Sequence, residues 1–275
     1  MTKFMGVEYA RGATATITNA GPSMGPKKIQ ELFPNSDWSI ISDTTKSPTE
    51  CATDRFGDTF EILDRVYKQT PREQHIMIGG DHSLNFGHVA AIADQLDTSD
   101  LCMVYIDAHL DMHTPQSSLS GAPHGTNVRA LLGNGDARWL AIPRRSPVLK
   151  PENVFYLGIR SYEDAEIEFA KQNNIYIRTP EQLKNESDLL KTVAEIRKKI
   201  NNRPFILSFD FDAIDPTLFP DVLVPEPNGI SIDTAKYLIS AFQDATGIEF
   251  VEYAPSGDKN CEKIAHELIS IVTND

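Results

Sequence analysis

Cysteine is scarce in this sequence. The 275 residues include three cysteines, at positions 51, 102 and 261, and no two of them form a Cys-x-x-Cys pair. Their odd number and wide spacing favour free thiols over a disulfide framework. Because Cys102 lies inside an apolar segment, we expect it to be a buried free thiol, which suits a reducing compartment.

Positive charge and long hydrophobic runs are also lacking. Lys and Arg number 26 against 39 Asp and Glu, so the formal net charge is −13. This balance argues against nucleic acid or an anionic membrane surface as a partner. No run approaches the ~18 apolar residues that span a bilayer. Residues 1–10 lack the apolar core and cleavage site of a secretory leader, so we expect a cytoplasmic protein.

Short apolar runs alternate with amphipathic stretches along almost the whole chain. Strands are expected near 2–7, 37–42, 75–79, 101–107, 153–159, 174–177, 204–211 and 247–253, and helices near 25–33, 57–69, 85–96, 126–132, 163–173, 187–201, 232–243 and 260–273. This alternation predicts an α/β fold with one parallel, doubly wound sheet. No low-complexity linker divides the sequence, so we expect residues 1–275 to form a single domain.

Three stretches rich in Gly, Pro and Ser follow, or lie near, the ends of the central strands. They cover residues 108–125, 133–152 and 212–230. Open α/β sheets bind their ligands at the carboxyl ends of the strands. These stretches are therefore candidate functional loops.

The first of these loops begins with a D-x-H-x-D motif. Asp107, His109 and Asp111 directly follow the apolar run 101–106. Side chains alternate along an extended chain, so we expect these three to project from the same side. Two carboxylates and an imidazole at one strand end are unfavourable together unless a cation neutralises them.

Two other apolar runs end in similar residues. The run 206–209 leads into Asp210 and Asp212, and the run 75–78 leads into His82. A single D-x-D motif would be explained by helix capping or by pairing with Lys, but three such strand ends are not. Four carboxylates and two imidazoles suffice for two divalent metals, with Mn²⁺ ahead of Zn²⁺, Co²⁺ or Ni²⁺. Two adjacent metals can share and activate a bridging hydroxide, so the sequence predicts a binuclear metal hydrolase.

Three motifs together resemble the ureohydrolase superfamily, which includes arginase, agmatinase, guanidinobutyrase and formimidoylglutamase. The motifs are Gly79–Ser83, Asp107–Asp111 and Ser208–Pro216. The resemblance implies a three-layer α/β/α fold with a mostly parallel, about eight-stranded sheet. It also implies two Mn²⁺ per subunit and assembly into trimers or hexamers. The implied metal ligands are His82, Asp107, His109, Asp111, Asp210 and Asp212.

The same resemblance assigns catalytic roles to three residues. Asp111 would orient the hydroxide, and His124 matches the histidine that shuttles a proton to the leaving amine. Glu252 matches the glutamate that holds a substrate guanidinium, which a carboxylate can bind through two parallel hydrogen bonds. Its neighbour Glu249 is interpreted as an ordinary strand-end acid.

The identity of the substrate depends on the loop that follows the D-x-H-x-D motif. Residues 107–125 match the arginase pattern without a gap and place Ser118 and Ser120 where arginases hold the substrate carboxylate. His113 replaces an asparagine of arginases, and formimidoylglutamases often have an arginine there. Glu163 could contact an α-amino group, whereas Ser161 cannot supply a charge at a position where arginases have an aspartate.

We therefore expect an arginase-type enzyme that converts L-arginine to L-ornithine and urea. The alternatives, in order, are formimidoylglutamase, then agmatinase or guanidinobutyrase, so the partner is a small guanidino or formimidoyl compound. Two other classes are a deacetylase with one zinc ion and a metal-stabilised, non-catalytic interaction protein. The intact His82 and Asp107 disfavour the deacetylase.

Overall fold

The computed structural model describes residues 2–13, 21–43 and 54–273, which build one eight-stranded sheet. The residue ranges of the strands are β1 (Lys3–Glu8), β2 (Asp37–Ser42), β3 (Ile76–Gly79), β4 (Cys102–Ile106), β5 (Val154–Leu157), β6 (Tyr176–Arg178), β7 (Phe205–Asp210) and β8 (Gly247–Val251). The strand order is β2-β1-β3-β8-β7-β4-β5-β6, and every neighbouring pair is parallel. The prediction of a parallel α/β sheet is confirmed.

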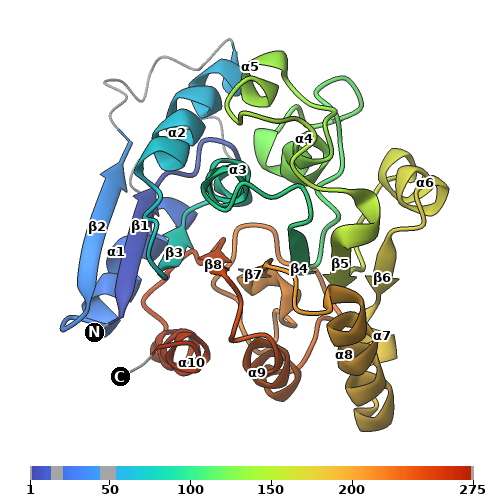
Figure 1. The fold of residues 1–275 in the computed structure, drawn as a ribbon. Helices are drawn as coiled ribbons and strands as arrows, with labels where there is room; N and C mark the ends of the chain where they lie inside the picture. Colours follow the sequence, from blue (N-terminus) through green and yellow to red (C-terminus); the bar gives the residue numbers. More distant parts are fainter. Residues whose placement is uncertain (1, 14–20, 44–53, 274–275) are drawn as a thin grey trace.

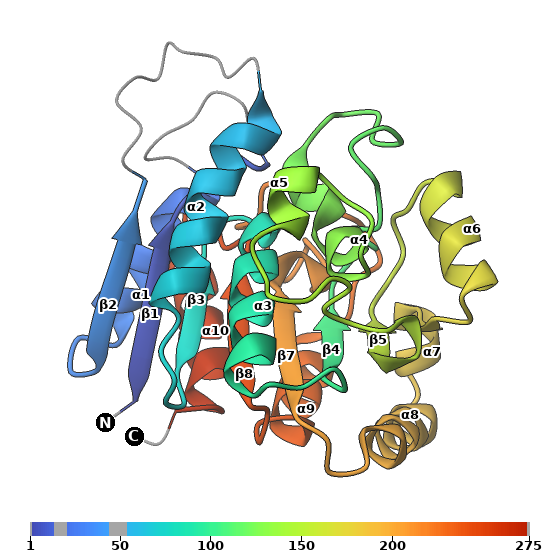
Figure 2. The same ribbon diagram turned by 45° about the horizontal axis from the view of Figure 1, so that its top comes forward.

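Helices cover both faces of this sheet and give the molecule three layers (Figure 1). Their ranges are α1 (Gly25–Leu32), α2 (Arg55–Gln69), α3 (Asn85–Gln95), α4 (Asn127–Leu131), α5 (Ala137–Leu140), α6 (Asp164–Gln172), α7 (Pro180–Leu183), α8 (Glu186–Ile200), α9 (Ile232–Ala241) and α10 (Lys259–Ser270). One core joins the sheet to α1, α7, α8, α9 and α10, and the other joins it to α2, α3, α4, α5 and α6. Figure 2 shows the same division from another angle.

The predicted elements agree with the observed ones apart from their ends and two short helices. Sequence periodicity found neither α5 nor α7, each of which has only four residues. A single helical turn is too short to show a hydrophobic repeat. Cys102 is a buried free thiol, as expected, and so is Cys261, whereas Cys51 lies outside the described residues.

The central strands are buried on both faces because helices pack on both. All residues of β4, β5, β7 and β8 are buried. Helix α3 is buried along almost its whole length, which is typical of a helix enclosed by other elements. None of the described helices is long and apolar enough to cross a membrane.

The strand order determines which loops meet. In sequence, β3, β4, β7 and β8 are far apart, but in the sheet they are consecutive in the order β3-β8-β7-β4. Because all are parallel, their carboxyl ends open at the same edge. The chain therefore brings together the residues that follow 79, 106, 210 and 251.

A row of polar side chains lies on one face of the sheet, beneath this edge. Aligned residues of neighbouring strands are Glu249 of β8, Ser208 of β7, Tyr105 of β4 and Tyr156 of β5. Residues paired across parallel strands point to the same face of the sheet. On this face lies α3.

Gly158 allows β5 to approach the D-x-H-x-D loop. Its φ is 97°, a left-handed conformation that favours glycine. A Cβ atom there would lie 2.9 Å from the carbonyl oxygen of Asp107. A larger residue would therefore push apart the backbone that carries Asp107.

We predict that Gly158→Ala destabilises the protein more than Gly257→Ala. Gly257 has a φ of 95°, but its added Cβ would meet no atom within 4 Å. Gly257→Ala should lower the free energy of unfolding by about 1 kcal/mol through the backbone conformation alone. Gly158→Ala should add roughly 1–3 kcal/mol from overpacking. Chemical denaturation of both variants measures the difference, and equal losses would contradict the contact with Asp107.

Candidate metal and substrate site

His82 is carried by a tight turn at the end of β3. Gly80 passes so close to Tyr9 that a Cβ atom would lie 1.9 Å from the Tyr9 carbonyl oxygen. Asp81 then caps the short 3₁₀ helix His82–Leu84 by accepting a hydrogen bond from Ser83 N at 3.0 Å. The turn thus places His82, which is buried, at the carboxyl edge of the sheet.

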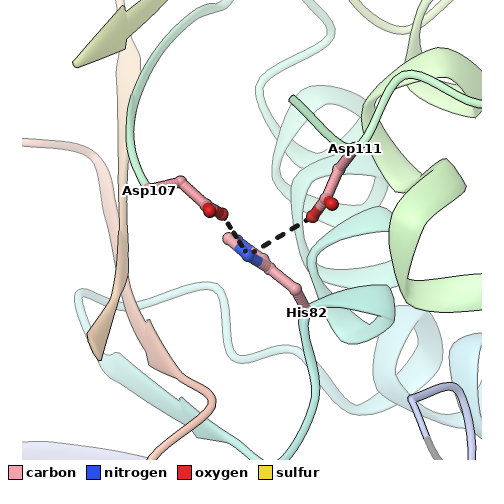
Figure 3. A group of neighbouring side chains, drawn as sticks. All are labelled: His82, Asp107 and Asp111. Carbon is pink, nitrogen blue, oxygen red and sulfur yellow. Dashed lines mark ion pairs between the residues drawn. The ribbon is translucent and has the colours of Figure 1, made fainter. Parts of the chain in front are cut away.

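The three residues of the D-x-H-x-D motif lie in the loop after β4 rather than in a strand. Strand β4 ends at Ile106, and Asp111 has a φ of 51°. The expectation that strand pleating alone aligns their side chains is therefore wrong. Asp107 and Asp111 both reach the His82 ring (Figure 3). Asp107 also lies 3.5 Å from His109.

Asp210 and Asp212 complete the cluster from β7. Asp210 is the last residue of that strand, and Asp212 lies in the 3₁₀ helix Phe211–Ala213. The Oδ1 atom of Asp212 accepts a hydrogen bond from Ala108 N at 3.1 Å. This bond ties the end of β7 to the D-x-H-x-D loop.

Two groups of ligand atoms share one residue. His82, Asp107 and Asp111 form one group, and Asp107, His109 and Asp212 form the other. His82 Nδ1 lies 2.9 Å from Asp107, 3.0 Å from Asp210 and 3.6 Å from Asp111. His109 Nδ1 lies 3.0 Å from Asp212. The structure thus brings all six predicted ligands together, with Asp107 between the two groups.

This donor set fits divalent cations better than it fits hydrogen bonding. One ring nitrogen of His82 faces three carboxylate groups, yet it carries at most one proton. Among the described residues, Asp107 Oδ2 has no hydrogen-bond partner although it is buried. Oxygen and imidazole ligands without cysteine suit Mn²⁺, and also Zn²⁺, Co²⁺ or Ni²⁺.

The pKa values of the buried acids also indicate that the cluster fits cations. Burial and the Asp107 carboxylate raise the pKa of Asp111 to about 7. Burial and Asp212 raise the pKa of Asp210 well above its usual range. The carboxylates thus destabilise one another's charged forms, and a bound cation would remove that penalty.

Tyr105 supports the cluster from below. Its ring stacks on His82 with a centroid separation of 4.4 Å and an interplanar angle of 7°. Its hydroxyl donates to Asp111 Oδ2 at 2.7 Å, and Asn127 Nδ2 donates to the same oxygen at 3.1 Å. These contacts fix the side chain of Asp111, whose backbone is in an unusual conformation.

His124 and Glu252 form a pair beside the metal cluster. His124 Nδ1 lies 3.1 Å from Glu252 Oε1, which also accepts a hydrogen bond from His82 N at 3.0 Å. Burial acts in the opposite direction, but the bond to Glu252 raises the pKa of His124 to about 9. Glu252 has a φ of 64°, and its Oε2 is buried without a partner among the described residues. Strained residues with unused polar atoms are typical of functional sites.

A pocket of about 410 Å³ opens above the cluster. Its lining includes two predicted ligands, His109 and Asp111, and four other predicted residues, His113, Ser120, His124 and Glu163. Ser118 does not line it. Its hydroxyl accepts a hydrogen bond from Gly121 N at 3.1 Å, which fixes the turn that carries Ser120.

His113 is enclosed by its own partners. Its Nδ1 lies 3.1 Å from Ser117 Oγ, and its Nε2 contacts Glu163 and lies 3.4 Å from Glu166. Glu163 and Glu166 also form a capping box at the start of α6. Both ring nitrogens are therefore engaged within the protein, which limits the capacity of His113 to bind a substrate carboxylate.

Sequence reasoning missed Glu226, which lines the same pocket. It accepts a hydrogen bond from Ser161 Oγ at 3.0 Å, and its Oε1 lies 3.7 Å from His109 Nε2. The only signal was its position in the Gly- and Pro-rich stretch 212–230, which indicates a functional loop but no particular residue. Glu226 thus places a negative charge next to Ser161, whose own side chain carries no charge.

Glu249 is not the strand-end acid that the sequence suggested. It lies in the middle of β8 and is fully buried. Its partners are Asn85 and His88 of α3. A hydrogen-bonded pair across a helix–sheet interface has no pattern in a single sequence.

Comparison with known proteins agrees with this geometry. The model of the arginase family matches residues 3–274. The arginase of Glaciozyma antarctica (strain PI12) is 31% identical over 208 residues, which are 72% of this chain and 59% of that protein. The matched segment spans about three fifths to two thirds of the first curated relatives.

Solved structures of arginases have the same fold as this protein. Entamoeba histolytica arginase in complex with L-ornithine has a TM-score of 0.85 and 25% identity, with 100% of this chain and 98% of that chain covered. Formimidoylglutamase from Bacillus subtilis has the same fold, with a TM-score of 0.75, 21% identity and coverage of 99% and 86%. The family model spans nearly the whole chain and the curated relative exceeds 30% identity, so this protein belongs to the arginase family.

Proposed function

We propose that this protein is a binuclear metal hydrolase that cleaves a C–N bond of a linear guanidino or amidine compound, with L-arginine as the first candidate substrate. The observation that carries the proposal is the pair of ligand groups sharing Asp107, next to the His124–Glu252 pair. Family membership supports the same reaction class. We also propose that residues 1–275 form one catalytic domain, in a cytoplasmic trimer or hexamer.

Six side chains would hold the metals, with Mn²⁺ as the first candidate. They are His82, Asp107, His109, Asp111, Asp210 and Asp212. Two bound divalent cations would supply Lewis acidity and lower the pKa of a water molecule between them.

Asp111 would orient the attacking water. Its Oδ2 already accepts hydrogen bonds from Tyr105 and Asn127. Its Oδ1 is then the atom left to accept a hydrogen bond from the water. Since Tyr105 and Asn127 are buried, the carboxylate is fixed before the substrate arrives.

Glu252 would hold the substrate's guanidinium. Its Oε1 accepts from His82 N and contacts His124, so Oε2 is the oxygen that remains. A carboxylate gives a planar cation both charge and orientation. Glu252 lies under His124, which itself lines the pocket.

His124 would donate the proton that the leaving amine requires. It lines the pocket, and its raised pKa keeps the imidazolium form present at neutral pH. After the proton is transferred, the Glu252 carboxylate would favour reprotonation of the ring.

The pocket above the cluster, which we call the outer pocket, favours substrates with a cationic tail. Three of the described residues lining it are carboxylates outside the proposed metal ligands, namely Glu163, Glu166 and Glu226, and none of the others there is Lys or Arg. The tail of L-arginine carries an ammonium group, which Glu163 and Glu226 could bind, and Ser120 could receive its carboxylate. Agmatine, whose tail is an ammonium group alone, is the second candidate. Tails with only carboxylates, as in 4-guanidinobutyrate and N-formimidoyl-L-glutamate, fit this charge poorly.

An activity panel on the Mn-loaded protein tests the function. It should contain L-arginine, agmatine, 4-guanidinobutyrate, guanidinopropionate and N-formimidoyl-L-glutamate, with both products identified. We expect urea from L-arginine, with agmatine next. Absence of hydrolysis of every compound would favour a non-catalytic, metal-stabilised protein.

The same panel on Glu226→Gln tests the charge of the outer pocket. The loss of one charge-assisted contact should lower kcat/KM for substrates with an ammonium tail by about 10–100-fold. Values for 4-guanidinobutyrate should stay constant or rise. A uniform loss for all substrates would assign Glu226 to the metal centre instead.

We predict that Asp212→Asn loses metal and activity together. A neutral amide leaves cation charge uncompensated, so one Mn²⁺ should bind more weakly by more than about 100-fold, which exceeds the usual effect of removing a supporting group. Isothermal titration calorimetry gives the stoichiometry. The exposed Asp233→Asn on α9 is the matched control and should bind metal as the wild type does. Two equivalents of tightly bound Mn²⁺ in Asp212→Asn would contradict its role as a ligand.

We predict that His124→Ala lowers kcat and keeps both metals. Loss of a general acid should reduce turnover about 100-fold or more. Metal analysis of the same sample separates this effect from loss of the cluster. Turnover equal to that of the wild type would exclude His124 from the reaction.

A further inference from the structure

Five buried polar residues beneath His82 take no part in the reaction described above. Asn85, His88, Ser208 and Glu249 have no exposed surface, and His75 is 4% exposed. Buried polar groups are unfavourable unless they are hydrogen-bonded to one another. Contacts run from His75, at the amino end of β3, through His88 to Glu249, and Ser208, the strand partner of Glu249, contacts His82.

These contacts start at the two histidines. His75 Nδ1 lies 2.9 Å from the carbonyl oxygen of Glu73, and His75 Nε2 lies 3.0 Å from His88 Nε2. His88 Nδ1 then lies 2.7 Å from Glu249 Oε2. Asn85, on the same helix as His88, donates its amide to the other oxygen of Glu249.

These partners determine where the protons lie. A carbonyl oxygen only accepts, so His75 donates from Nδ1 and, as a neutral ring, accepts at Nε2. Burial and the proximity of His88 lower the pKa of His75 to about 4, in agreement with a neutral ring. His88 must therefore donate from Nε2, while its Nδ1 shares a second proton with the Glu249 carboxylate. The His88–Glu249 contact is then a fully enclosed hydrogen bond to the Glu249 carboxylate.

Ser208 lies between Glu249 and the metal cluster. It is aligned with Glu249 across β7 and β8, and its Oγ lies 2.8 Å from His82 Nε2. Burial alone would raise the pKa of Glu249, but hydrogen bonds from His88 and Ser208 lower it. A Ser208 hydroxyl that donates to Glu249 leaves its oxygen free to accept the Nε2 proton of His82.

We propose that His75, His88 and Glu249 act through Ser208 as a positioning relay that keeps the proton of His82 on Nε2 and presents Nδ1, as a lone pair, to the metal. The inference rests on the metal centre of the proposed function. Nδ1 is the ring nitrogen that faces Asp107, Asp210 and Asp111. Groups that hold a histidine ligand in this way commonly change metal affinity 10–100-fold when removed.

The charge on Glu249 is the reason to assign this contact a role beyond packing. A buried carboxylate with its polar partners is often no more stable than well-packed apolar residues of the same volume. An apolar pair here would leave the Ser208 hydroxyl without its acceptor and His82 without a fixed tautomer. The charge on Glu249 therefore has a defined effect at His82, two side chains away.

Three variants test the relay by calorimetric titration of the metal-free protein with Mn²⁺. Ser208→Ala cuts the link to His82 and keeps the His88–Glu249 contact, Glu249→Gln removes the charge, and His88→Gln removes the imidazole that binds Glu249. Each should weaken the binding of one Mn²⁺ about 10–100-fold. The EPR spectrum of the loaded variants should change from that of a spin-coupled pair toward that of a single Mn²⁺.

Tyr67→Phe is the matched control. Tyr67 donates a hydrogen bond of 2.7 Å to Asp94, which lies on the same helix as His88 but belongs to neither the relay nor the cluster. It should lower the melting temperature of the metal-free protein and leave Mn²⁺ affinity unchanged. If Glu249→Gln does not fold, the Mn²⁺ affinity and EPR spectrum of Ser208→Ala test the relay instead.

Wild-type affinity and an unchanged EPR spectrum in folded Ser208→Ala or His88→Gln would overturn the relay and leave a purely structural cluster. Calorimetry needs no substrate, so failure of the activity panel would not produce this result. A wild-type protein that binds no Mn²⁺ would overturn the relay together with the metal centre.

Discussion

The electrostatic repulsion among four buried aspartates is the constraint on which the rest of this structure depends. Asp107, Asp111, Asp210 and Asp212 converge around His82 and His109. In a buried environment such a set is stable only if cations bind or some of the acids stay protonated. The raised pKa values of Asp111 and Asp210 express this repulsion directly. The fold must therefore hold these side chains against forces that would separate them, and much of the surrounding architecture serves that purpose.

The parallel sheet supplies the rigidity. The order β3-β8-β7-β4 brings four strand ends to one edge, and each ligand lies within a few residues of a fully buried strand. Below that edge, the aligned side chains of Glu249, Ser208 and Tyr105 support the cluster from one face. Ser208 and Tyr105 contact His82 directly, one by a hydrogen bond and the other by ring stacking. The left-handed backbone of Asp111 persists because Tyr105 and Asn127 fix its side chain.

The sequence predicted the elements of this fold better than the contacts between them. Apolar runs and their periodicity located the strands, because burial on both faces leaves a strong local signal. Strand order leaves no such signal, so the nearness of β8 to β3 and β7 came only from the structure. The motif residues were found because each follows an apolar run. Strand pleating does not produce their alignment, which comes from the loop after β4. The role of Glu249 was misread and Glu226 was missed because the partners of both are distant in sequence.

The acidic residues that line the outer pocket are of two kinds. Glu163 and Glu166 start α6 as a capping box, and Glu166 also accepts a hydrogen bond from Met112 N at 2.9 Å. Because these two carboxylates stabilise the local fold, substitution of either one would disturb the structure. Glu226 lies outside any helix or strand, and its carboxylate contacts Ser161 and His109. It caps none of the described helices, so its charge can be removed without disturbing the start of α6. The charge of the pocket can therefore change at Glu226 independently of the local fold, which is not true of Glu163 and Glu166.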